Sequence, residues 1–425
     1  MRVLTVVKDL NLGGTQRVAQ NLTLGVRDRG VEVALFAHEG LGTRAAMLEA
    51  EGVTLFGPLD GKADVFAQVI AWEPDIVHIH RSGYPNLRET TLIRTFREAG
   101  AKIVETNVFA RFDHTLEPGL IDVHAQLSEW CMLKWRLWSG SRGGASVVLP
   151  NAVDTSRFER ATSEARQRIR DELGVAEGTV LFGRIGQPIA EKWDPAIFEV
   201  FAQGVAQGWD IALLLVGAPA IYPALAEGLP KAAARRIFFI ESRNDDSRLM
   251  GLYSAMDAFL HLAKIGESFG MVLCEAMLCE VPVITLSTPL RDNSQLEVIQ
   301  HGVGGFVATD QDGLLKAMDL LRGDLVAREA MGRRARQSVL DRFSLPIVAE
   351  KAIAIYSALL AKDARALPER LSGLAGVQRD MAWMQELSTN SFGHGLRLRD
   401  RIGIALIHSP IFYRLFRRLK TLQAR

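Results

Sequence analysis

Residues 267–285 read Glu267-Ser-Phe-Gly-Met-Val-Leu-Cys-Glu275 and continue as Ala276-Met-Leu-Cys-Glu-Val-Pro-Val-Ile-Thr285. The stretch begins in a glycine-containing loop and continues as an apolar segment that favours a helix. It ends in a β-branched run after Pro282, which predicts a buried strand. The order of loop, helix and strand indicates one repeat of a parallel α/β sheet.

The same alternation of short β-branched runs and amphipathic stretches extends in both directions along the chain. The first series of predicted strands is Val3–Val7, Val31–Ala37, Val53–Phe56, Asp75–His80 and Lys102–Thr106, with helix-like segments Thr15–Arg29, Ala63–Trp72 and Leu87–Ala99 between them. The second series is Thr179–Gly183, Ile211–Gly217, Ile237–Glu241, Ala258–Leu262, Val281–Leu286 and Gly305–Ala308. Apolar strands separated by helices predict two doubly wound parallel sheets of the Rossmann type.

The polar segment Asp154–Val175 separates the two series and is the expected linker. We therefore predict an α/β fold with one Rossmann-like domain at 1–155 and a second at 175–345, facing a cleft at the carboxyl ends of both sheets. Residues 346–425 form a predicted helical extension that begins with Leu345–Leu360. Its end is a basic tail with Arg397, Arg399, Arg401, Arg414, Arg417, Arg418, Lys420 and Arg425 against Asp400.

The bulk composition is that of a soluble globular enzyme of two domains. The chain has 425 residues, of which 48% are hydrophobic and 23% charged, and its formal net charge is +1. This balance argues against nucleic acid as a partner. Three cysteines without a CxxC pair, no signal-peptide pattern and no run of about 18–20 apolar residues favour a reduced, cytoplasmic setting.

Glu267 and Glu275 are the first candidates for chemistry. Eight helical residues span about 12 Å, which suits two contacts with one extended ligand better than a shared proton. The backbone N–H groups of Ser268, Phe269 and Gly270 lie at the predicted helix start, a favourable place for a diphosphate. The simpler interpretation is a pair of ordinary surface charges. It is weakened because Glu275 lies in an apolar helix, where an unpaired charge is costly.

This stretch resembles the E-x7-E donor-site signature of the retaining glycosyltransferases of family 4, which have the GT-B fold. Three other segments agree with the family pattern in the right order. They are the glycine pair in Asn11-Leu-Gly-Gly-Thr-Gln-Arg-Val18, the stretch Phe182-Gly-Arg-Ile-Gly-Gln-Pro-Ile-Ala-Glu-Lys192, and Glu297-Val-Ile-Gln-His-Gly-Val-Gly-Gly-Phe306. The resemblance covers about residues 1–360.

The resemblance implies a role for each matching residue. Arg184 and Lys192 would bind the two phosphates, Glu267 the hydroxyls of the transferred sugar, and Glu275 the ribose. The implied donor-binding set is Gly13, Gly14, Arg184, Lys192, Glu267, Ser268, Phe269, Gly270, Met271, Val272 and Glu275, and the implied catalytic set is Glu267, Arg184, Lys192 and His114. The co-substrate would be a UDP- or GDP-linked sugar, with no other cofactor and no divalent metal.

The acceptor side departs from the family pattern. Asn107 stands where relatives often place a histidine after the fifth strand, and His114 further along the loop is the alternative. His80 and His78 end the fourth strand on one face. They could form half of a metal site, but without a third ligand we expect satisfied histidines beside the cleft. The interval from Arg184 to Lys192 is also longer than usual and contains Pro188.

Two further motifs have a structural and a functional interpretation. Asn244-Asp-Asp-Ser247 has the form of a metal-binding D-x-D motif, but it precedes the helical run Arg248–Met256, so helix capping is the simpler explanation. Trp130-Cys-Met-Leu-Lys-Trp-Arg-Leu-Trp138 is either one face of the core or an interfacial patch for lipid headgroups. The basic tail likewise predicts either docking on anionic lipid or a helix packed on the first domain.

The combined interpretation is a retaining hexosyltransferase that moves a sugar from a nucleoside diphosphate to a hydroxyl acceptor. The expected acceptor is a lipid-linked or polysaccharide-precursor glycan, handled in the cytoplasm or at the inner face of the cytoplasmic membrane. The alternatives are a non-catalytic nucleotide-sugar-binding or assembly protein, favoured by Asn107, and a GT-B-like epimerase or phosphorylase. The sequence leaves the base, the sugar and the acceptor open.

Overall fold

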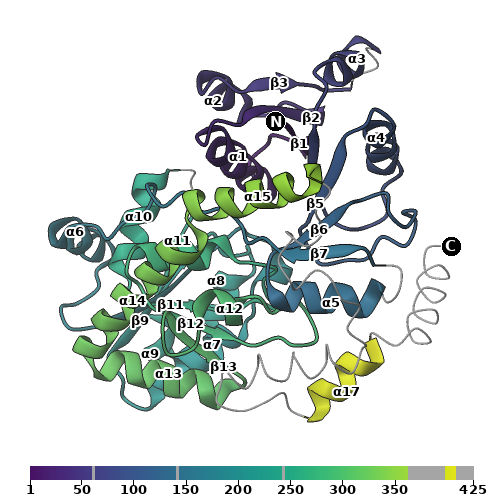
Figure 1. The fold of residues 1–425 in the computed structure, drawn as a ribbon. Coiled ribbons are helices and arrows are strands. Elements are labelled where there is room, and N and C mark those ends of the chain that lie inside the picture. Colours follow the sequence, from purple (N-terminus) through teal and green to yellow (C-terminus); the bar gives the residue numbers. More distant parts are fainter. Residues whose placement is uncertain (60–62, 140–142, 242–244, 362–397, 408–425) are drawn as a thin grey trace. The chain divides into compact units, whose positions relative to one another are not determined.

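The computed structural model describes residues 1–59, 63–139, 143–241, 245–361 and 398–407. The chain divides into two units, each with its own parallel sheet (Figure 1). The first unit contains Met1–Asp154 and the chain from Phe343 through α15 (Leu345–Leu360), and the second contains Thr155–Arg342. The predicted architecture of two Rossmann-like parallel-sheet units is therefore confirmed, whereas the cleft between them stays a prediction.

The sheet of the first unit has seven strands in the order β3-β2-β1-β4-β5-β6-β7, all parallel. Its strands are β1 (Arg2–Asp9), β2 (Glu32–Gly40), β3 (Thr54–Phe56), β4 (Ile76–Arg81), β5 (Lys102–Asn107), β6 (Val123–Gln126) and β7 (Ala145–Val148), and its helices include α1 (Gly14–Arg27), α2 (Ala45–Ala50), α3 (Ala63–Ala71), α4 (Leu87–Glu98) and α5 (Glu129–Ser139). The sequence did not predict β6 and β7. The sequences of β6 (VHAQ) and β7 (ASVV) contain polar residues, so neither forms a continuous apolar run, and both strands extend the sheet beyond β5.

Side chains of alternating strand residues enter two separate cores. On one face Val3, Val7 and Val104 pack with α1 and with Val348 and Ala352 of α15. The other face packs against α3 and α4 through the apolar side chains of Leu4, Val6, Val77, Leu92, Ile93 and Phe96. Because β4 lies between β1 and β5, its alternating residues place His78 and His80 on the α15 side and the next residue, Arg81, on the α4 side.

The second sheet has six parallel strands in the order β10-β9-β8-β11-β12-β13. Its strands are β8 (Val180–Ile185), β9 (Ile211–Val216), β10 (Ile237–Ile240), β11 (Ala258–His261), β12 (Val283–Leu286) and β13 (Gly305–Ala308). The helices of this unit are α6 (Ser163–Leu173), α7 (Ala196–Ala206), α8 (Tyr222–Glu227), α9 (Lys231–Ala234), α10 (Asp246–Ala255), α11 (Met271–Leu278), α12 (Gln295–Ile299), α13 (Gln311–Gly323) and α14 (Leu325–Phe343), with a 3₁₀ turn at Ala190–Lys192.

The unit boundaries differ from those expected. Helix α6, which we assigned to the linker, packs on α10, and its Arg166 and Arg170 pair with the buried Asp257. Helix α15, which we assigned to the extension, packs on α1 in the first unit, where Glu350 pairs with Arg29 at 3.0 Å. Most of the predicted basic tail lies outside the described residues. Its described part is α17 (Leu398–Ile407), in which Ile404 is buried.

Three smaller expectations can be compared with the structure. Trp130 and Trp135 are 1% exposed in α5, so the core interpretation is confirmed for them and an interfacial patch formed by these two rings is wrong. The side chain of Asp245 accepts a hydrogen bond from the backbone N–H of Arg248 at 3.1 Å, which confirms helix capping of α10. Among the described residues, no helix is both long and apolar enough to cross a bilayer.

Both sheets have the same reversal of strand order. The first strand of each series lies beside the fourth, so that β1 pairs with β4 and β8 pairs with β11. Helical crossovers leave these two strands in opposite directions, and ligands of α/β proteins bind at the carboxyl ends of such a pair. The topology therefore points to one candidate site in each unit.

Candidate functional site

Arg184 lies near the carboxyl end of β8 and is 2% exposed. Its guanidinium stacks on the ring of Trp193 at 4.5 Å, and one nitrogen, Nη2, donates to the backbone oxygen of Lys192. Nε and Nη1 are buried and have no partner among the described residues. Burial lowers the pKa of Arg184 to about 10, although Glu267 acts in the opposite direction. A buried cation with unused donors is a costly arrangement that a phosphate would satisfy.

Lys192 ends a 3₁₀ turn that brings it close to the loop following β11. The turn closes through a hydrogen bond from the Lys192 N–H to the Ile189 oxygen at 2.9 Å, so the longer interval that contains Pro188 is accommodated locally. Backbone bonds from Asp194 to Leu262 and from Ile265 to Glu191 join the two loops. The predicted pair of phosphate-binding cations therefore comes together in the second unit, with Lys192 only half-buried.

Glu267 lies in the loop between β11 and α11, and its carboxylate Oε1 is 3.0 Å from His261 Nε2. Burial would raise the pKa of Glu267, but His261, Lys192 and Arg184 more than offset it, so the pKa lies below its usual value. Burial, together with Arg184, lowers the pKa of His261 to about 4. At neutral pH an ionised carboxylate can only accept, so the neutral His261 donates from Nε2. Its Nδ1 is then an acceptor, buried and without a partner among the described residues.

A second loop holds the backbone of Glu267 in place. The Glu267 N–H donates to the side-chain oxygen of Gln295 at 3.1 Å, and the Ser294 N–H donates to the Glu267 oxygen at 2.9 Å. Gly266 has φ +67°, and a Cβ there would lie 1.7 Å from the backbone oxygen of Asp292. Only glycine therefore allows the two loops to approach this closely.

Glu275 lies on α11, and its carboxylate accepts a hydrogen bond from the Tyr253 hydroxyl at 2.9 Å. Burial raises the pKa of Glu275, and the Tyr253 hydrogen bond opposes this shift. Helix α11 begins after Gly270, whose φ is +91°. Phe269 is 1% exposed, so its ring belongs to the core, whereas Ser268, Met271 and Val272 are half-buried at the helix start.

The predicted glycine loop lies in the other unit, after β1. Gly13 precedes α1 in an extended conformation, and a Cβ there would meet the side-chain oxygen of Gln16 at 2.3 Å. A Cβ on Gly14 would meet nothing within 4 Å. The described residues therefore leave open space beside Gly14, which is compatible with a ligand.

The acceptor-side candidates have three different environments. Asn107 is buried, and its amide donates to the Arg111 oxygen at 2.7 Å and accepts from the Arg111 N–H at 3.1 Å, which closes a turn. His114 lies half-buried later in the same loop. His78 is satisfied by Tyr356 at 2.6 Å and Thr106 at 2.7 Å, as predicted. His80 is not: it is 4% exposed, and neither ring nitrogen has a partner among the described residues.

The environment of His80 predicts acid sensitivity of the first unit. Burial lowers the pKa of His80 from 6.5 to about 4. Between these values the unfolded chain binds a proton that the folded chain does not, so stability is complete above pH 6.5 and falls as the pH drops toward 4. We expect His80 to contribute a loss of about 3 kcal/mol in the free energy of unfolding over this pH range. Chemical denaturation of a His80→Leu variant should show a smaller loss of stability at acid pH than the wild type. An identical loss in the variant and the wild type would contradict this role.

Sequence reasoning missed two residues of the second-unit site, His261 and Gln295. His261 ends a predicted strand, which was a usable signal, whereas Gln295 offered none. Among the described residues no group of three His, Cys, Asp or Glu side chains is arranged to hold a metal ion.

Comparisons with known proteins agree with this geometry. Residues 177–324, which lie in the second unit, match the sequence model of the family described as Glycosyl transferases group 1. The chain is 26% identical over 238 residues to the GDP-mannose-dependent monoacylated alpha-(1-6)-phosphatidylinositol monomannoside mannosyltransferase of Corynebacterium glutamicum. That alignment covers 54% of this chain and 61% of the relative, so the chain spans about three fifths of the relative's length.

Two other matches extend over most of the chain. The phosphatidyl-myo-inositol mannosyltransferase of Mycobacterium tuberculosis is 26% identical over 396 residues, which covers 83% of this chain and 95% of the relative. A crystal structure of the Anabaena protein HepE in complex with UDP and glucose has a TM-score of 0.63 at 20% identity and covers 84% of this chain and 100% of its own. Residues 177–324 of the second unit thus resemble a group 1 glycosyltransferase domain, and the two parallel-sheet units have the GT-B fold of the matching structure.

Proposed function

We propose that this protein transfers a sugar from a nucleoside diphosphate donor to a hydroxyl acceptor, with retention of the anomeric configuration. The observation that carries the proposal is Arg184, a buried cation with two unused nitrogens at the β8–β11 reversal. Beside it lie Lys192 and the ionised Glu267. Two cations and one carboxylate at the carboxyl ends of these strands suit a diphosphate joined to a sugar.

In this proposal the protein acts by positioning and by stabilising charge. Arg184 and Lys192 bind the diphosphate and stabilise the negative charge that develops on it as its bond to the sugar breaks. Glu267 accepts hydrogen bonds from sugar hydroxyls, with its carboxylate oriented by His261. Glu275, which is already bonded to Tyr253, accepts a hydrogen bond from the ribose.

The proposal for the acceptor rests on fewer observations than the proposal for the donor. Two relatives are named for phosphatidylinositol-based acceptors, which supports a lipid-linked or glycan acceptor for this chain as well. We extend the proposal to work at an anionic membrane surface on the cytoplasmic side. Helix α17 supports this because Leu398, Ile402 and Leu406 are exposed beside Arg399 and Arg401.

One observation favours a second candidate function, a nucleotide-sugar-binding protein without transfer activity. Asn107 stands where relatives often have a histidine, and its amide is used in the turn to Arg111. Such a protein would bind the donor without consuming it. The epimerase alternative has no comparable observation in its favour.

The test begins with the donor. UDP- and GDP-linked sugars are each added to the purified protein, and the melting temperature is recorded. One of them at 100 times its dissociation constant should stabilise the protein by about 2.7 kcal/mol. That donor is then incubated with soluble glycans and with lipid-linked acceptors in anionic vesicles, and released nucleotide is measured. Stabilisation without release of nucleotide in any mixture would favour the binding protein, and no stabilisation by any donor would contradict both functions.

A further inference from the structure

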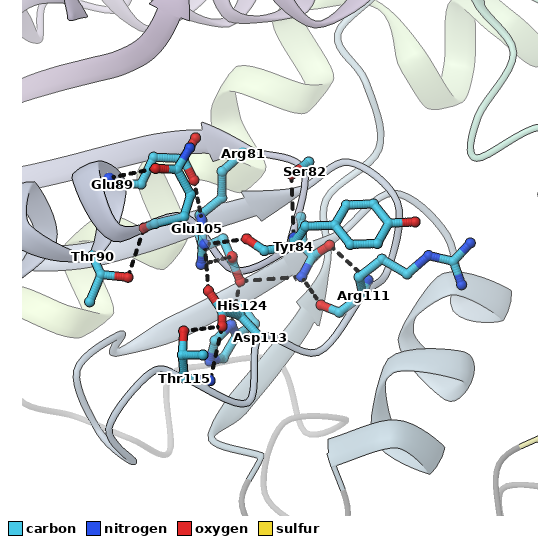
Figure 2. A network of polar contacts seen from close by, with 12 residues as sticks. Arg81, Ser82, Tyr84, Glu89, Thr90, Glu105, Arg111, Asp113, Thr115 and His124 are labelled. Carbon is cyan, nitrogen blue, oxygen red and sulfur yellow. Dashed lines mark hydrogen bonds and ion pairs between the residues drawn. The ribbon is translucent and has the colours of Figure 1, made fainter. Parts of the chain in front are cut away.

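A buried charge network at the end of β4 lies outside the proposed donor site (Figure 2). Arg81 has a fully buried side chain that pairs with three carboxylates. These are Glu89 of α4 at 2.8 Å, Glu105 of β5 at 3.3 Å, and Asp113 of the loop after β5 at 2.7 Å. Arg81 also donates to the backbone oxygen of Tyr84 at 2.9 Å.

The network extends to β6, where His124 is a second partner of Glu105. His124 Nδ1 lies 2.5 Å from Glu105 Oε2. Burial alone would raise the pKa of Glu105, but His124 and Arg81 more than offset it and hold the pKa below its usual value. Burial likewise opposes ionisation of Asp113, yet its hydrogen bonds from Arg81 and Thr115 lower its pKa. Removing one partner would therefore leave charges buried and unpaired.

The network joins loops that otherwise have little regular structure. Residues 108–122 connect β5 to β6 without a helix, although parallel neighbours are usually joined by one. Asp113 fixes the middle of this loop to Arg81, and Asn107 fixes its start through Arg111. Tyr84 belongs to the loop after β4 and is held by the same guanidinium. One buried arginine thus sets the positions of two loops at the carboxyl edge of the sheet.

These two loops carry an exposed group of side chains that the donor site does not use. Tyr84 and Phe109 are 51% and 39% exposed, which is unusual for aromatic rings without a partner surface. The guanidinium of Arg111 lies 5.8 Å from the Tyr84 ring centroid (Figure 2). No carboxylate among the described residues pairs with Arg111, and its Nε is buried without a partner. We call Tyr84, Phe109 and Arg111 the aromatic–arginine lip.

A small polar pocket opens beside the lip. It has a volume of about 20 Å³, enough for one water-sized group, and Arg111, Asn107, Asp113, His124 and Trp135 are among the residues that line it. Carboxylates, an amide and an imidazole can accept or donate hydrogen bonds to a hydroxyl. Aromatic rings offer apolar faces to a sugar ring, and an unpaired guanidinium binds phosphate in a fork geometry.

We propose that the aromatic–arginine lip binds the acceptor as a phosphate-bearing sugar or polyol, and that Arg81 is the positioning residue that holds the lip in place. The inference rests on the proposed function only in calling this ligand the acceptor, because binding of the ligand can be measured without transfer. Arg111 binds the phosphate, the rings of Tyr84 and Phe109 contact the sugar or polyol, and Arg81 acts through the two loops.

The first test measures binding. The probes are α-glucose 1-phosphate and myo-inositol 1-phosphate, each compared with its dephosphorylated form, on the full-length protein by isothermal titration calorimetry. We expect at least one phosphate probe to bind ten times more tightly than its neutral form, and Arg111→Gln to remove that difference. The control is Arg94→Gln, a half-exposed arginine of α4 that pairs with Glu117 on the surface. Binding of neither phosphate probe, or an equal loss in both variants, overturns the assignment.

The second test separates positioning from general support of the fold. Asp113→Asn keeps the shape of a side chain in the network, and Arg94→Gln removes the surface pair with Glu117 that joins the same loop to α4. We expect Asp113→Asn to weaken probe binding about tenfold and to speed hydrogen exchange in 108–122, whereas Arg94→Gln leaves both unchanged. The melting-point shift caused by the nucleoside diphosphate donor should persist in both variants.

The outcomes distinguish this inference from the proposed function. If Asp113→Asn reduces donor stabilisation as much as probe binding, the network supports the whole unit and the positioning role is overturned. If the donor stabilises neither the wild type nor the variants, the proposed function fails. Probe binding then still tests whether the aromatic–arginine lip binds a phosphate-bearing ligand. If Asp113→Asn does not fold, Thr115→Ala gives the same test, because Thr115 donates to Asp113 Oδ1 at 2.6 Å.

Discussion

Replacing Arg184 with Met is expected to reduce the transfer rate by about 100- to 1,000-fold, the usual cost of removing one group that stabilises transition-state charge. The same change should leave the second unit as stable as the wild type, or more stable. Nε and Nη1 of Arg184 are buried without a partner among the described residues, so an apolar side chain of similar volume removes a desolvated charge. Steady-state transfer assays and chemical denaturation measure the two effects on the same protein.

A matched control for this prediction is Arg170→Met in the same unit. Arg170 is equally buried, but it pairs with Asp257 at 3.2 Å and donates to the Ala255 oxygen at 3.0 Å. Asp257 keeps Arg166 and Arg328 as partners, but the backbone oxygens of Ala255 and Thr179 lose their buried donor, so we expect destabilisation of about 1–3 kcal/mol. A stability loss at Arg184 like that at Arg170, with transfer retained, would show that Arg184 is structural.

Replacing Glu267 with Ala is expected to reduce the transfer rate by a similar factor of about 100 or more. The carboxylate is held ionised by His261, Lys192 and Arg184, and it is oriented by the hydrogen bond from His261. Without it, the sugar hydroxyls lose their charged acceptor and the two cations are left unopposed. Kinetics with saturating donor should show the loss in kcat, because the binding of the diphosphate itself is retained.

Glu275→Gln is the comparison for the Glu267 prediction. The amide can still accept from Tyr253, whose hydroxyl lies 2.9 Å from the carboxylate, so the helix is preserved. Because Glu275 is assigned to the ribose, we expect a donor KM raised up to about tenfold, with kcat nearly unchanged. Equal effects of both substitutions on kcat would contradict the division between sugar and ribose contacts.

The strand pattern was predictable because parallel strands buried on both faces are short apolar runs in any sequence that forms them. Strand β13 and helix α15 both begin and end at the predicted residues. Strands β6 and β7 were missed because His124, Gln126 and Ser146 interrupt their apolar runs. The domain limits were misjudged for a different reason: α6 and α15 are amphipathic helices, and an amphipathic helix does not reveal which core it covers.

The residues of the candidate site also differ in whether local sequence motifs could indicate them. The sequence could propose Glu267, Glu275, Arg184 and Lys192 because they occupy fixed positions in local motifs. His261 lies only six residues before Glu267, so its position in β11 was a signal that the sequence did offer. Gln295 was missed because its contact with Glu267 joins two loops that are 28 residues apart in the chain. The Arg81 network was missed for that reason as well, since its partners come from α4, β5 and the loop after β5.

By itself, then, the sequence determined the alternation of strands and helices, the family motifs and the residues within them, because these depend on neighbours along the chain. The tertiary structure alone decided which of those side chains are buried, which are paired and which donors and acceptors stay unused. Burial and pairing set the cost of each charge, and that cost is the basis on which we propose Arg184 as a binding residue and Arg81 as a positioning residue.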